Sequence, residues 1–464
     1  MNAPATTSVW CELALIDDRV QPGVTLGIDH GRIGSIDVAT EPDDSPTDTV
    51  RLAGLTVPGL ANAHSHAFHR ALRSRTQAER GTFWTWRDLM YRAADRLEPD
   101  TYRRLARAVY AEMAMAGVTC VGEFHYLHHR PDGTPYDDPN AMGRALLDAA
   151  ADAGIRITLL DTAYLHGGLD ADGHRPAAGV QRRFDDGDVD AWRRRVDRLA
   201  DELTADEPSG GDSRRIGAAV HSVRAVDPDA MRQIGEWAAA RSAPLHAHVS
   251  EQVAENEACR ARHGRTPMAV LADAGLLSER FAAVHATHLT DDDVALLASS
   301  GSSVVMCPTT ERDLGDGIGP TREFADAGVA MAVGSDSHAV IDLFEEARAL
   351  ELDERLRSRE RGIHAAPDLL VMATAEGHRT LGWSDAGSIA VGRRADLVTV
   401  RLDSVRTAGV TADAAVEAVV FAASAVDVTD VFVDGRHVVA GARHATIDVE
   451  TELAATIEEL MSDG

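Results

Sequence analysis

Histidine and aspartate side chains in three separate stretches of the chain are of the types that hold a divalent metal ion. His64 and His66 stand two residues apart, His246 and His248 follow much later, and Asp336 and His338 later still. Residues i and i+2 of a strand point to the same face, so the first two imidazoles can meet one ion. Such a pair alone could be two exposed histidines near a turn. Three stretches, each at the end of an expected strand, predict one metal site.

The chemistry that such a site supplies is hydrolysis. Imidazole and carboxylate donors, with no thiolate among them, suit zinc, and iron or manganese are the alternatives. A divalent ion lowers the pKa of a water molecule bound to it to about 7, so hydroxide becomes available at neutral pH. The three stretches therefore predict a metal-dependent hydrolase.

The elements that must position these residues are the strands of an α/β fold. Short apolar runs alternate with amphipathic stretches, such as the helices expected over 99–116 and 227–241, and this alternation is typical of repeated βα units. Eight units predict a (β/α)8 barrel of the TIM type, with its site at the C-terminal strand ends. The candidate strands are Thr56–His66, Val118–Phe124, Ile155–Tyr164, Ile216–Val223, Leu245–Ser250, Ala282–Leu289, Ser303–Thr309 and Val329–Ser335.

Both ends of the chain differ in pattern from the middle. Apolar residues alternate around glycine turns near both termini, which predicts antiparallel strands. We expect residues 1–57 and 388–464, the latter with a terminal helix, to form one small β-sandwich domain. Residues 58–387 are expected to form the catalytic barrel, and the polar segment 201–215 a surface loop.

The composition excludes several classes of partner. The 464 residues carry a formal net charge of −28, and all 46 basic residues are arginine. That charge repels nucleic acid and anionic membranes, so we expect neither as a partner. No apolar run approaches the roughly 20 residues of a membrane span, and the first residues do not resemble a signal peptide. Four scattered cysteines suit a reducing cytoplasm.

The arrangement resembles the amidohydrolase superfamily. The segments 58–66 and 387–398 carry the resemblance together with His248, His285 and Asp336, so it spans most of the chain. It implies an amidohydrolase-type barrel whose metal ligands are His64, His66, His248 and Asp336. Superfamily members with two metal ions bridge them through a carboxylated lysine, and this chain has no lysine. A single metal ion, as in the deaminases, is what remains.

The same resemblance implies three catalytic residues. Asp336 would bind the metal and accept a proton from water, and His285 would hold or polarise the hydroxide. Glu251, three residues after His248, would protonate the leaving nitrogen. Without the resemblance, a glutamate at that place could equally be a solvated residue at a helix N-terminus.

Longer segments narrow the resemblance to the formimidoylglutamate deiminase family. They are 66–72, 81–91, 122–129, 220–226, 284–289 and 307–317. The resemblance implies hydrolysis of N-formimidoyl-L-glutamate, a dianionic small molecule of histidine degradation, to N-formyl-L-glutamate and ammonia, by a chain that forms homodimers. The implied substrate-binding residues are His69, Arg87, Tyr126, His221 and Arg224.

Arginine suits such a substrate because its planar fork binds carboxylates through two hydrogen bonds. At the position of His69 the family often has glutamine, and a histidine there can still donate a hydrogen bond. The remaining histidines of the same segments, His125, His128, His129 and His288, are expected to be structural or to lie behind the ligands.

Two other functions stay open. A deaminase of the same subtype could act on a ring, such as guanine or an adenine nucleoside, and would use aromatic stacking residues without the arginine pair. A barrel relative that has lost its metal could serve as an assembly protein, although that would require missing ligands and all four are present.

Overall fold

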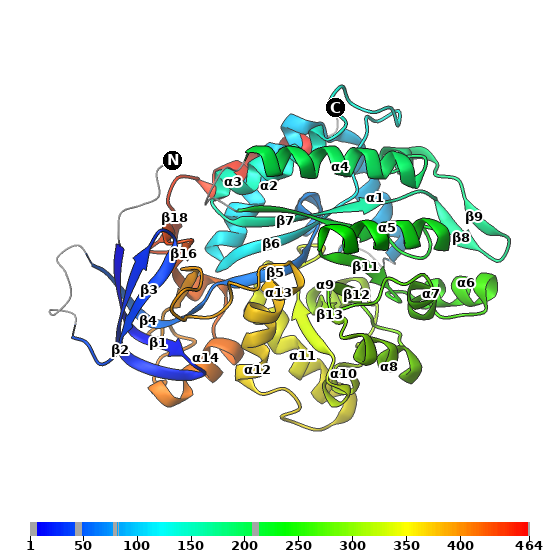
Figure 1. The fold of residues 1–464 in the computed structure, drawn as a ribbon. Helices are drawn as coiled ribbons and strands as arrows, with labels where there is room; N and C mark the ends of the chain where they lie inside the picture. Colours follow the sequence, from blue (N-terminus) through cyan, green and yellow to red (C-terminus); the bar gives the residue numbers. More distant parts are fainter. Residues whose placement is uncertain (1–6, 42–48, 78–80, 82, 207–212, 463–464) are drawn as a thin grey trace.

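Eight parallel strands form the centre of the molecule in the computed structural model, which describes residues 7–41, 49–77, 81, 83–206 and 213–462 (Figure 1). Neighbouring strands are paired from one end of this sheet to the other, and the first and last strands approach each other to give a nearly closed barrel. The strands are β5 (Leu60–Ser65), β6 (Val118–His125), β7 (Arg156–Ala163), β10 (Arg214–Val220), β11 (Leu245–Val249), β12 (Phe281–His285), β13 (Ser303–Met306) and β14 (Ala330–Val333). The predicted barrel is confirmed.

Helices connect the strands and cover the outside of the barrel (Figure 1). The helix predicted over 227–241 begins at Pro228 because Asp227 accepts hydrogen bonds from the backbone N–H groups of Asp229 and Ala230. The helices are α1 (Phe83–Arg96), α2 (Pro99–Met115), α3 (Ala141–Ala153), α4 (Val189–Asp206), α5 (Pro228–Arg241), α6 (Val253–His263), α7 (Pro267–Asp273), α8 (Asp291–Ser300), α9 (Pro308–Leu314), α10 (Thr321–Ala327), α11 (Leu343–Ser358), α12 (Ala366–Val371) and α13 (Gly377–Thr380).

The two termini build a second sheet of eight strands beside the barrel (Figure 1). Strand β4 (Val50–Pro58) joins the two parts of the chain. It pairs in parallel with β1 of the N-terminal part and antiparallel with β15 of the C-terminal part. The strands are β1 (Thr7–Ile16), β2 (Arg19–Asp29), β3 (Arg32–Asp37), β4 (Val50–Pro58), β15 (Leu397–Val400), β16 (Val428–Val433), β17 (Arg436–Ala440) and β18 (Arg443–His444). Helix α14 (Ala415–Phe421) lies between β15 and β16 in the chain and packs against α11 and α12, and α15 (Val449–Met461) follows β18 and packs against α2. A small β domain made from both termini is thus confirmed as one mixed sheet.

The first predicted strand, Thr56–His66, is wrong as a single element. Its first residues belong to β4 in the terminal sheet, and only β5 belongs to the barrel. The chain passes between the sheets at Gly59, where a β-carbon would lie 2.4 Å from Thr119 Oγ1. Only glycine allows this close approach, so the apolar run is divided between two sheets although its pattern is continuous.

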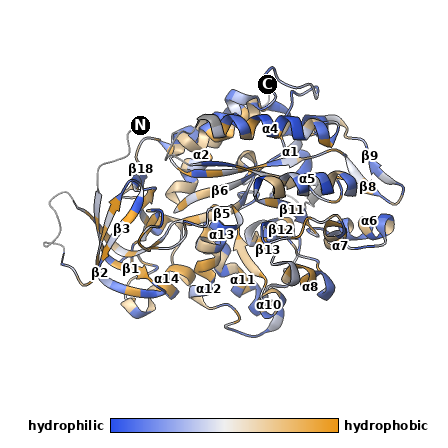
Figure 2. Ribbon diagram, in the orientation of Figure 1, coloured by the Kyte–Doolittle hydropathy of each residue, from blue (hydrophilic) through white to orange (hydrophobic). Residues whose placement is uncertain are grey.

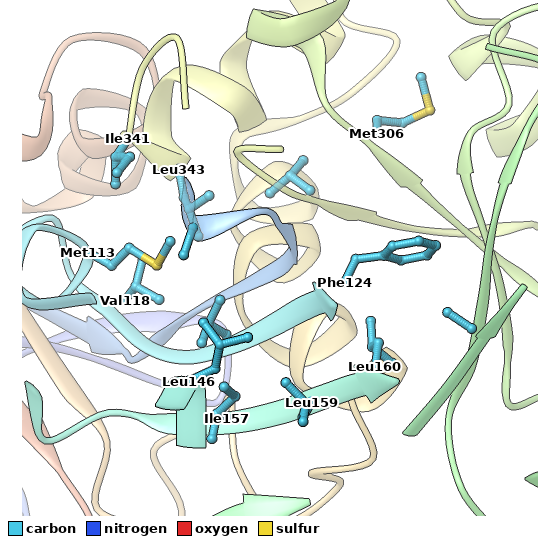
Figure 3. Close-up of a cluster of buried hydrophobic side chains, with 14 of the residues drawn as sticks. Met113, Val118, Phe124, Leu146, Ile157, Leu159, Leu160, Met306, Ile341 and Leu343 are labelled. Atoms are coloured by element: carbon cyan, nitrogen blue, oxygen red, sulfur yellow. The ribbon is translucent and has the colours of Figure 1, made fainter. Parts of the chain in front are cut away.

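The hydrophobic core lies inside the strand and helix layers. β6 and β7 are buried along their whole length, which explains why apolar residues occur on both faces of these strands. Figure 2 shows hydrophilic residues on the outer helices α4 to α6 and hydrophobic residues along the barrel strands. In Figure 3, Val118 and Phe124 of β6 and Ile157, Leu159 and Leu160 of β7 extend from adjacent strands into this core.

The barrel closes between β14 and β5 through the segments that carry the predicted ligands. A single bridge joins Ser65 and Asp336, and the backbone N–H of Asp336 donates to the carbonyl oxygen of His64 at 3.0 Å. The N–H of His66 donates back to the carbonyl oxygen of Asp336 at 3.3 Å. The closure therefore fixes the His64–His66 segment against the Asp336 turn.

The loop predicted over 201–215 is shorter than expected. Helix α4 continues to Asp206 and β10 begins at Arg214, while residues 207–212 lie outside the described part of the chain. The predicted boundaries near residues 57 and 388 stay predictions. Among the described residues, no helix is both long enough and apolar enough to cross a membrane.

Candidate metal centre and substrate cavity

Three strand ends bring the four predicted metal ligands together at one end of the barrel. His64 lies on β5, with His66 directly after that strand, and His248 lies on β11. Asp336 lies in the turn after β14, not on the strand, with a φ of 41°. This left-handed conformation is strained for a non-glycine residue, and such strain is typical of functional sites. All four residues are buried.

The distances between the ligand atoms fit one tetrahedral cation. His64 Nε2 lies 3.2 Å from Asp336 Oδ1 and 3.2 Å from His248 Nε2, and His66 Nε2 lies 3.4 Å from the same aspartate oxygen. Ligands at zinc-to-nitrogen distances of about 2.0–2.1 Å are about 3.3 Å apart in a tetrahedron. Two facing imidazole nitrogens at this distance repel each other unless a proton or a cation lies between them. The donor set therefore fits a divalent ion.

Hydrogen bonds behind the ligands orient their rings. The Nδ1 atom of His66 is 2.9 Å from the carbonyl oxygen of Phe124, and Nδ1 of His248 is 2.9 Å from that of His221. Each Nδ1–H donates to its carbonyl, which leaves the Nε2 lone pair directed at the centre. Burial lowers the pKa of His66 to about 3 and also lowers the pKa of His248, which keeps both rings in the neutral, ligating form.

Carboxylates surround His285 at the edge of the metal group. His285 Nε2 lies 3.9 Å from Glu251 Oε1 and 4.0 Å from Asp336 Oδ2, while its Nδ1 lies 3.5 Å from Glu311 Oε1. Burial alone would lower the pKa of His285, but Glu251, Glu311 and Asp336 outweigh it and raise this pKa to about 10. Burial raises the pKa of Glu251, which favours its protonated form. The structure thus places beside the ligands a His285–Glu251 pair in which the charge of each group shifts the pKa of the other.

A cavity above the ligands contains the predicted substrate-binding residues. His69 and Tyr126 join across it through a contact of 3.1 Å between Nε2 and the phenol oxygen. Arg87 lies with its guanidinium carbon 5.3 Å from the centre of the Tyr91 ring, and Arg224 enters the cavity beyond β10. The lining consists of His66, His69, Trp86, Arg87, Met90, Tyr91, Tyr126, Tyr164, Phe184, His221, Arg224, His248, Glu251, His285, Leu314 and Asp336. Ten of the eleven predicted site residues line this cavity, and His64 is buried beneath it.

His69 also lies close enough to the ligands to belong to a metal-binding group. One ring nitrogen of His69, one of His66 and one carboxylate oxygen of Asp336 lie within 4.8 Å of one another. Burial lowers the pKa of His69 well below its usual value, so the ring is neutral at physiological pH. The side chain is therefore a hydrogen-bonding group of fixed charge at neutral pH.

Sequence reasoning missed a buried polar network that supports the ligands. Glu123 accepts hydrogen bonds from the hydroxyl of Ser65 at 2.7 Å and from the backbone N–H of Ala67 at 2.7 Å. Ser65 Oγ also lies 3.2 Å from His338 Nε2, whose Nδ1 lies 2.9 Å from Ser335 Oγ. We call Asn62, Ser65, Glu123, Ser335 and His338 the seam network.

The seam network links both sides of the barrel closure. Asn62 Nδ2 donates to Ser335 Oγ at 2.7 Å, and the N–H of Ser335 donates to Asn62 Oδ1 at 2.9 Å. Ser65 and Ser335 each neighbour a predicted ligand in the chain, so the network fixes how far the histidine pair lies from the aspartate. The only sequence signal was a set of polar residues inside apolar strand ends.

The other histidines of the segments that carry the resemblance contact protein groups away from the metal ligands. His128 Nε2 lies 3.0 Å from the carbonyl oxygen of Thr162, and His129 Nε2 lies 3.2 Å from Asp186 Oδ1. His125 packs edge-on against His128, with ring centres 4.7 Å apart. None of these three, nor His288, belongs to a metal-binding group among the described residues.

Comparison with known proteins places this site in a family. The model of the amidohydrolase family matches residues 55–438. The chain belongs to the amidohydrolase family. It is also a homologue of the formimidoylglutamate deiminase of Pseudomonas aeruginosa, with 40% identity over 452 residues that cover 95% of this chain and 96% of the relative.

Other amidohydrolases are similar over most of the chain. A 5-methylthioadenosine/S-adenosylhomocysteine deaminase of Moorella thermoacetica is 29% identical and covers 90% of this chain, which in turn covers 89% of it. The crystal structure of an amidohydrolase from Brucella melitensis superposes with a TM-score of 0.89 at 33% identity, covering 98% of this chain and 100% of that one. An atrazine chlorohydrolase from Arthrobacter aurescens, solved with zinc, gives a TM-score of 0.84 at 25% identity, with 98% and 100% covered.

Proposed function

We propose that this amidohydrolase hydrolyses N-formimidoyl-L-glutamate to N-formyl-L-glutamate and ammonia, using one zinc ion. The observation that carries the proposal is the presence of Arg87 and Arg224 in the same cavity as the His/Asp group. A chain of net charge −28 needs such cations to hold a substrate with two carboxylates. The similarity to a formimidoylglutamate deiminase over nearly the full length supports the same substrate.

The metal site comes first in the proposed mechanism. His64, His66, His248 and Asp336 would hold the ion, because their donor atoms have tetrahedral spacing. When bound, a divalent ion supplies the positive charge that makes water acidic enough to act as a nucleophile near neutral pH. His64 is fully buried, so this group lies at the inner end of the cavity and meets only the reacting end of the substrate.

The protein side chains then handle the protons. Asp336 accepts a proton from the attacking water, and its Oδ2 atom lies 4.0 Å from His285 Nε2 on the side away from His64. Water adds to the formimidoyl carbon, and His285, held by Glu251 and Glu311, orients the attack. Glu251 donates a proton to the amino nitrogen of the tetrahedral adduct, which leaves as ammonia. As the adduct collapses to the formamide, its hydroxyl proton passes to the Glu251 carboxylate, and Asp336 releases the first proton to solvent.

The far end of the substrate would bind between the two arginines. Arg87 and Arg224 supply forked donors for the carboxylates, and His69, Tyr126 and His221 supply further polar atoms. His221 is fixed because its ring lies 5.5 Å from Tyr126 and 4.7 Å from Tyr164, centre to centre. The substrate is thereby held with its imino carbon toward the ligands.

Release of ammonia tests the proposal. The purified zinc-loaded protein is incubated in parallel with N-formimidoyl-L-glutamate, guanine and adenosine, and ammonia is measured in each. We expect release from N-formimidoyl-L-glutamate alone. Preferential release from guanine or adenosine would replace the proposal with a ring deaminase. A purified protein that takes up no divalent metal and releases no ammonia would favour the non-catalytic barrel.

The proposal extends to assembly and location. We propose a homodimer that works in the cytoplasm, in keeping with the family and with four cysteines that are all free and buried. Light scattering of the purified chain, with a mass near twice 49.6 kDa expected, tests the dimer. A mass of one chain at micromolar concentration would contradict it.

A further inference from the structure

Arg224 is held from behind by a buried glutamate that no catalytic step uses. Glu255 lies in the first turn of α6, and its side chain is fully buried. Its Oε2 atom lies 3.3 Å from Arg224 Nε. Neither of these two buried atoms has a hydrogen-bond partner among the described residues. The two atoms instead face each other as an ion pair.

The second oxygen of Glu255 connects this arginine to the catalytic turn. Oε1 accepts a hydrogen bond of 3.1 Å from the backbone N–H of Ser250. Ser250 has a φ of 53° and stands between His248 and Glu251 in the chain. One carboxylate therefore contacts both the turn that carries the proposed proton donor and the arginine proposed to bind the substrate.

Arg224 separates two cavities. It lines the cavity above the metal group and also an adjoining cavity behind it, and the two share Arg87, Tyr164 and His221. Glu255 lines only the cavity behind Arg224. Because the Nε–H side faces Glu255, the two terminal nitrogens form the guanidinium edge that remains for a carboxylate in the substrate cavity.

We propose that Glu255 is a positioning residue that determines specificity for carboxylate-bearing substrates by fixing Arg224. This inference rests on the proposed function, because it assigns Arg224 to a substrate carboxylate. A guanidinium on a loop has many rotamers, and holding Nε in advance reduces the entropy lost when the substrate binds. Before the substrate binds, Glu255 also offsets the charge of Arg224, which lowers the free-energy cost of removing the guanidinium from water.

The alternative is that Glu255 weakens substrate binding. A carboxylate that competed with the substrate for Arg224 would weaken substrate binding, and its removal would lower KM. The competition requires Glu255 to occupy the terminal nitrogens, whereas its contact is with Nε and its other oxygen is held by Ser250. We therefore expect removal of the charge to raise KM.

The experiment compares two substrates and four proteins. The substrates are N-formimidoyl-L-glutamate and N-propylformamidine, which has the same reacting group and no carboxylate. The zinc-loaded proteins are the wild type, Glu255→Gln, Arg224→Met and the double variant. Glu257→Gln is the matched control, because Glu257 lies on the same helix and is exposed.

For Glu255→Gln we expect KM for N-formimidoyl-L-glutamate to rise by about ten- to a hundredfold, as for loss of one member of a close charge pair. We expect kcat to stay within about threefold, and kcat/KM for N-propylformamidine to equal that of the wild type. The double variant should be no worse than Arg224→Met, since Glu255 would act only through that arginine. Glu257→Gln should match the wild type throughout.

Three results would overturn the inference. An equal loss of kcat/KM for both substrates would show that Glu255 supports the Ser250 turn instead. A lower KM would show competition for Arg224. Additive losses in the double variant would show that Glu255 acts independently of Arg224.

The same measurements separate this inference from the proposed function. A wild type that releases no ammonia from N-formimidoyl-L-glutamate would contradict the function itself, whereas a normal wild type with an unaffected Glu255→Gln would contradict only the role of Glu255. If Glu255→Gln fails to fold, Glu255→Asp keeps the charge but shortens the reach, and a raised KM for the glutamate substrate alone is then expected. An unchanged KM in a folded Glu255→Asp would count against the inference.

Discussion

Replacing Glu251 by glutamine separates proton transfer from metal binding. The change keeps the shape of the side chain and removes the acidic proton. Glu251 Oε1 lies 3.9 Å from His285 Nε2, and Glu251 is in none of the groups whose donor atoms converge for a metal. The variant should therefore bind zinc as the wild type does. General acid–base catalysis contributes about 10²–10⁴-fold, which is about 3–5 kcal/mol of transition-state stabilisation, so kcat should fall by that factor.

The assay is ammonia release from N-formimidoyl-L-glutamate, with zinc content measured on the same samples. Glu251→Asp is the informative second variant, because it keeps the acid but withdraws it by about one bond length, and a misplacement of that size costs up to about 10²-fold. Glu257→Gln on the exposed face of α6 serves as control. A kcat within about threefold of the wild type in Glu251→Gln, with zinc bound, would refute the proton-donor role.

Three further predictions concern the metal, the seam network and acid stability. Asp336→Asn should retain less than about a tenth of an equivalent of zinc by metal analysis, because a neutral amide replaces the shared carboxylate, and a stoichiometric metal content would contradict this. Glu123→Gln should weaken zinc affinity by about 10–100-fold, since Ser65 and Ala67 lose their shared carboxylate, and an unchanged Kd in a competition titration would argue against it. Burial, followed by Arg156, lowers the pKa of His378 to about 3. The unfolded histidine takes up a proton below about pH 6.5 and the folded one does not until about pH 3, so stability falls as the pH drops through this window, by about 2–3 kcal/mol between pH 6 and 4. His378→Gln should remove that part of the loss in urea unfolding at the two pH values, and an equal loss in both proteins would refute the assignment.

The barrel could be predicted because its strands are buried on both faces. Runs such as Val118–His125 and Arg156–Ala163 have apolar residues on both faces and are separated by amphipathic helices, which is a strong pattern. The division at Gly59 could not be predicted, because hydrophobicity does not change there. It is decided by the space beside Thr119, which exists only after β4 and β6 have folded against each other.

The ligands were accessible to sequence reasoning for a similar reason. Their side chains repeat at strand ends, and a barrel brings all strand ends to one place. The supporting groups were not accessible, because their partners are distant in the chain. Asn62 and Ser335 are 273 positions apart, and the Glu255–Arg224 contact joins a helix to a different loop. A glutamate in the first turn of a helix has a common explanation in the helix dipole, so only its burial against an arginine distinguishes Glu255.

The net charge and the cavity act on the substrate at different ranges. Most of the excess acid is on exposed side chains, whose field is screened over about 8 Å at physiological ionic strength. Glu255 is fully buried and the Arg224 side chain is only 20% exposed, so their interactions with a bound molecule are screened far less. A dianion that reaches the cavity therefore responds mainly to the arginines there and to the carboxylate that holds one of them. An acidic chain can in this way select an anionic substrate, provided that its cations line a cavity and are forked and fixed before the substrate arrives.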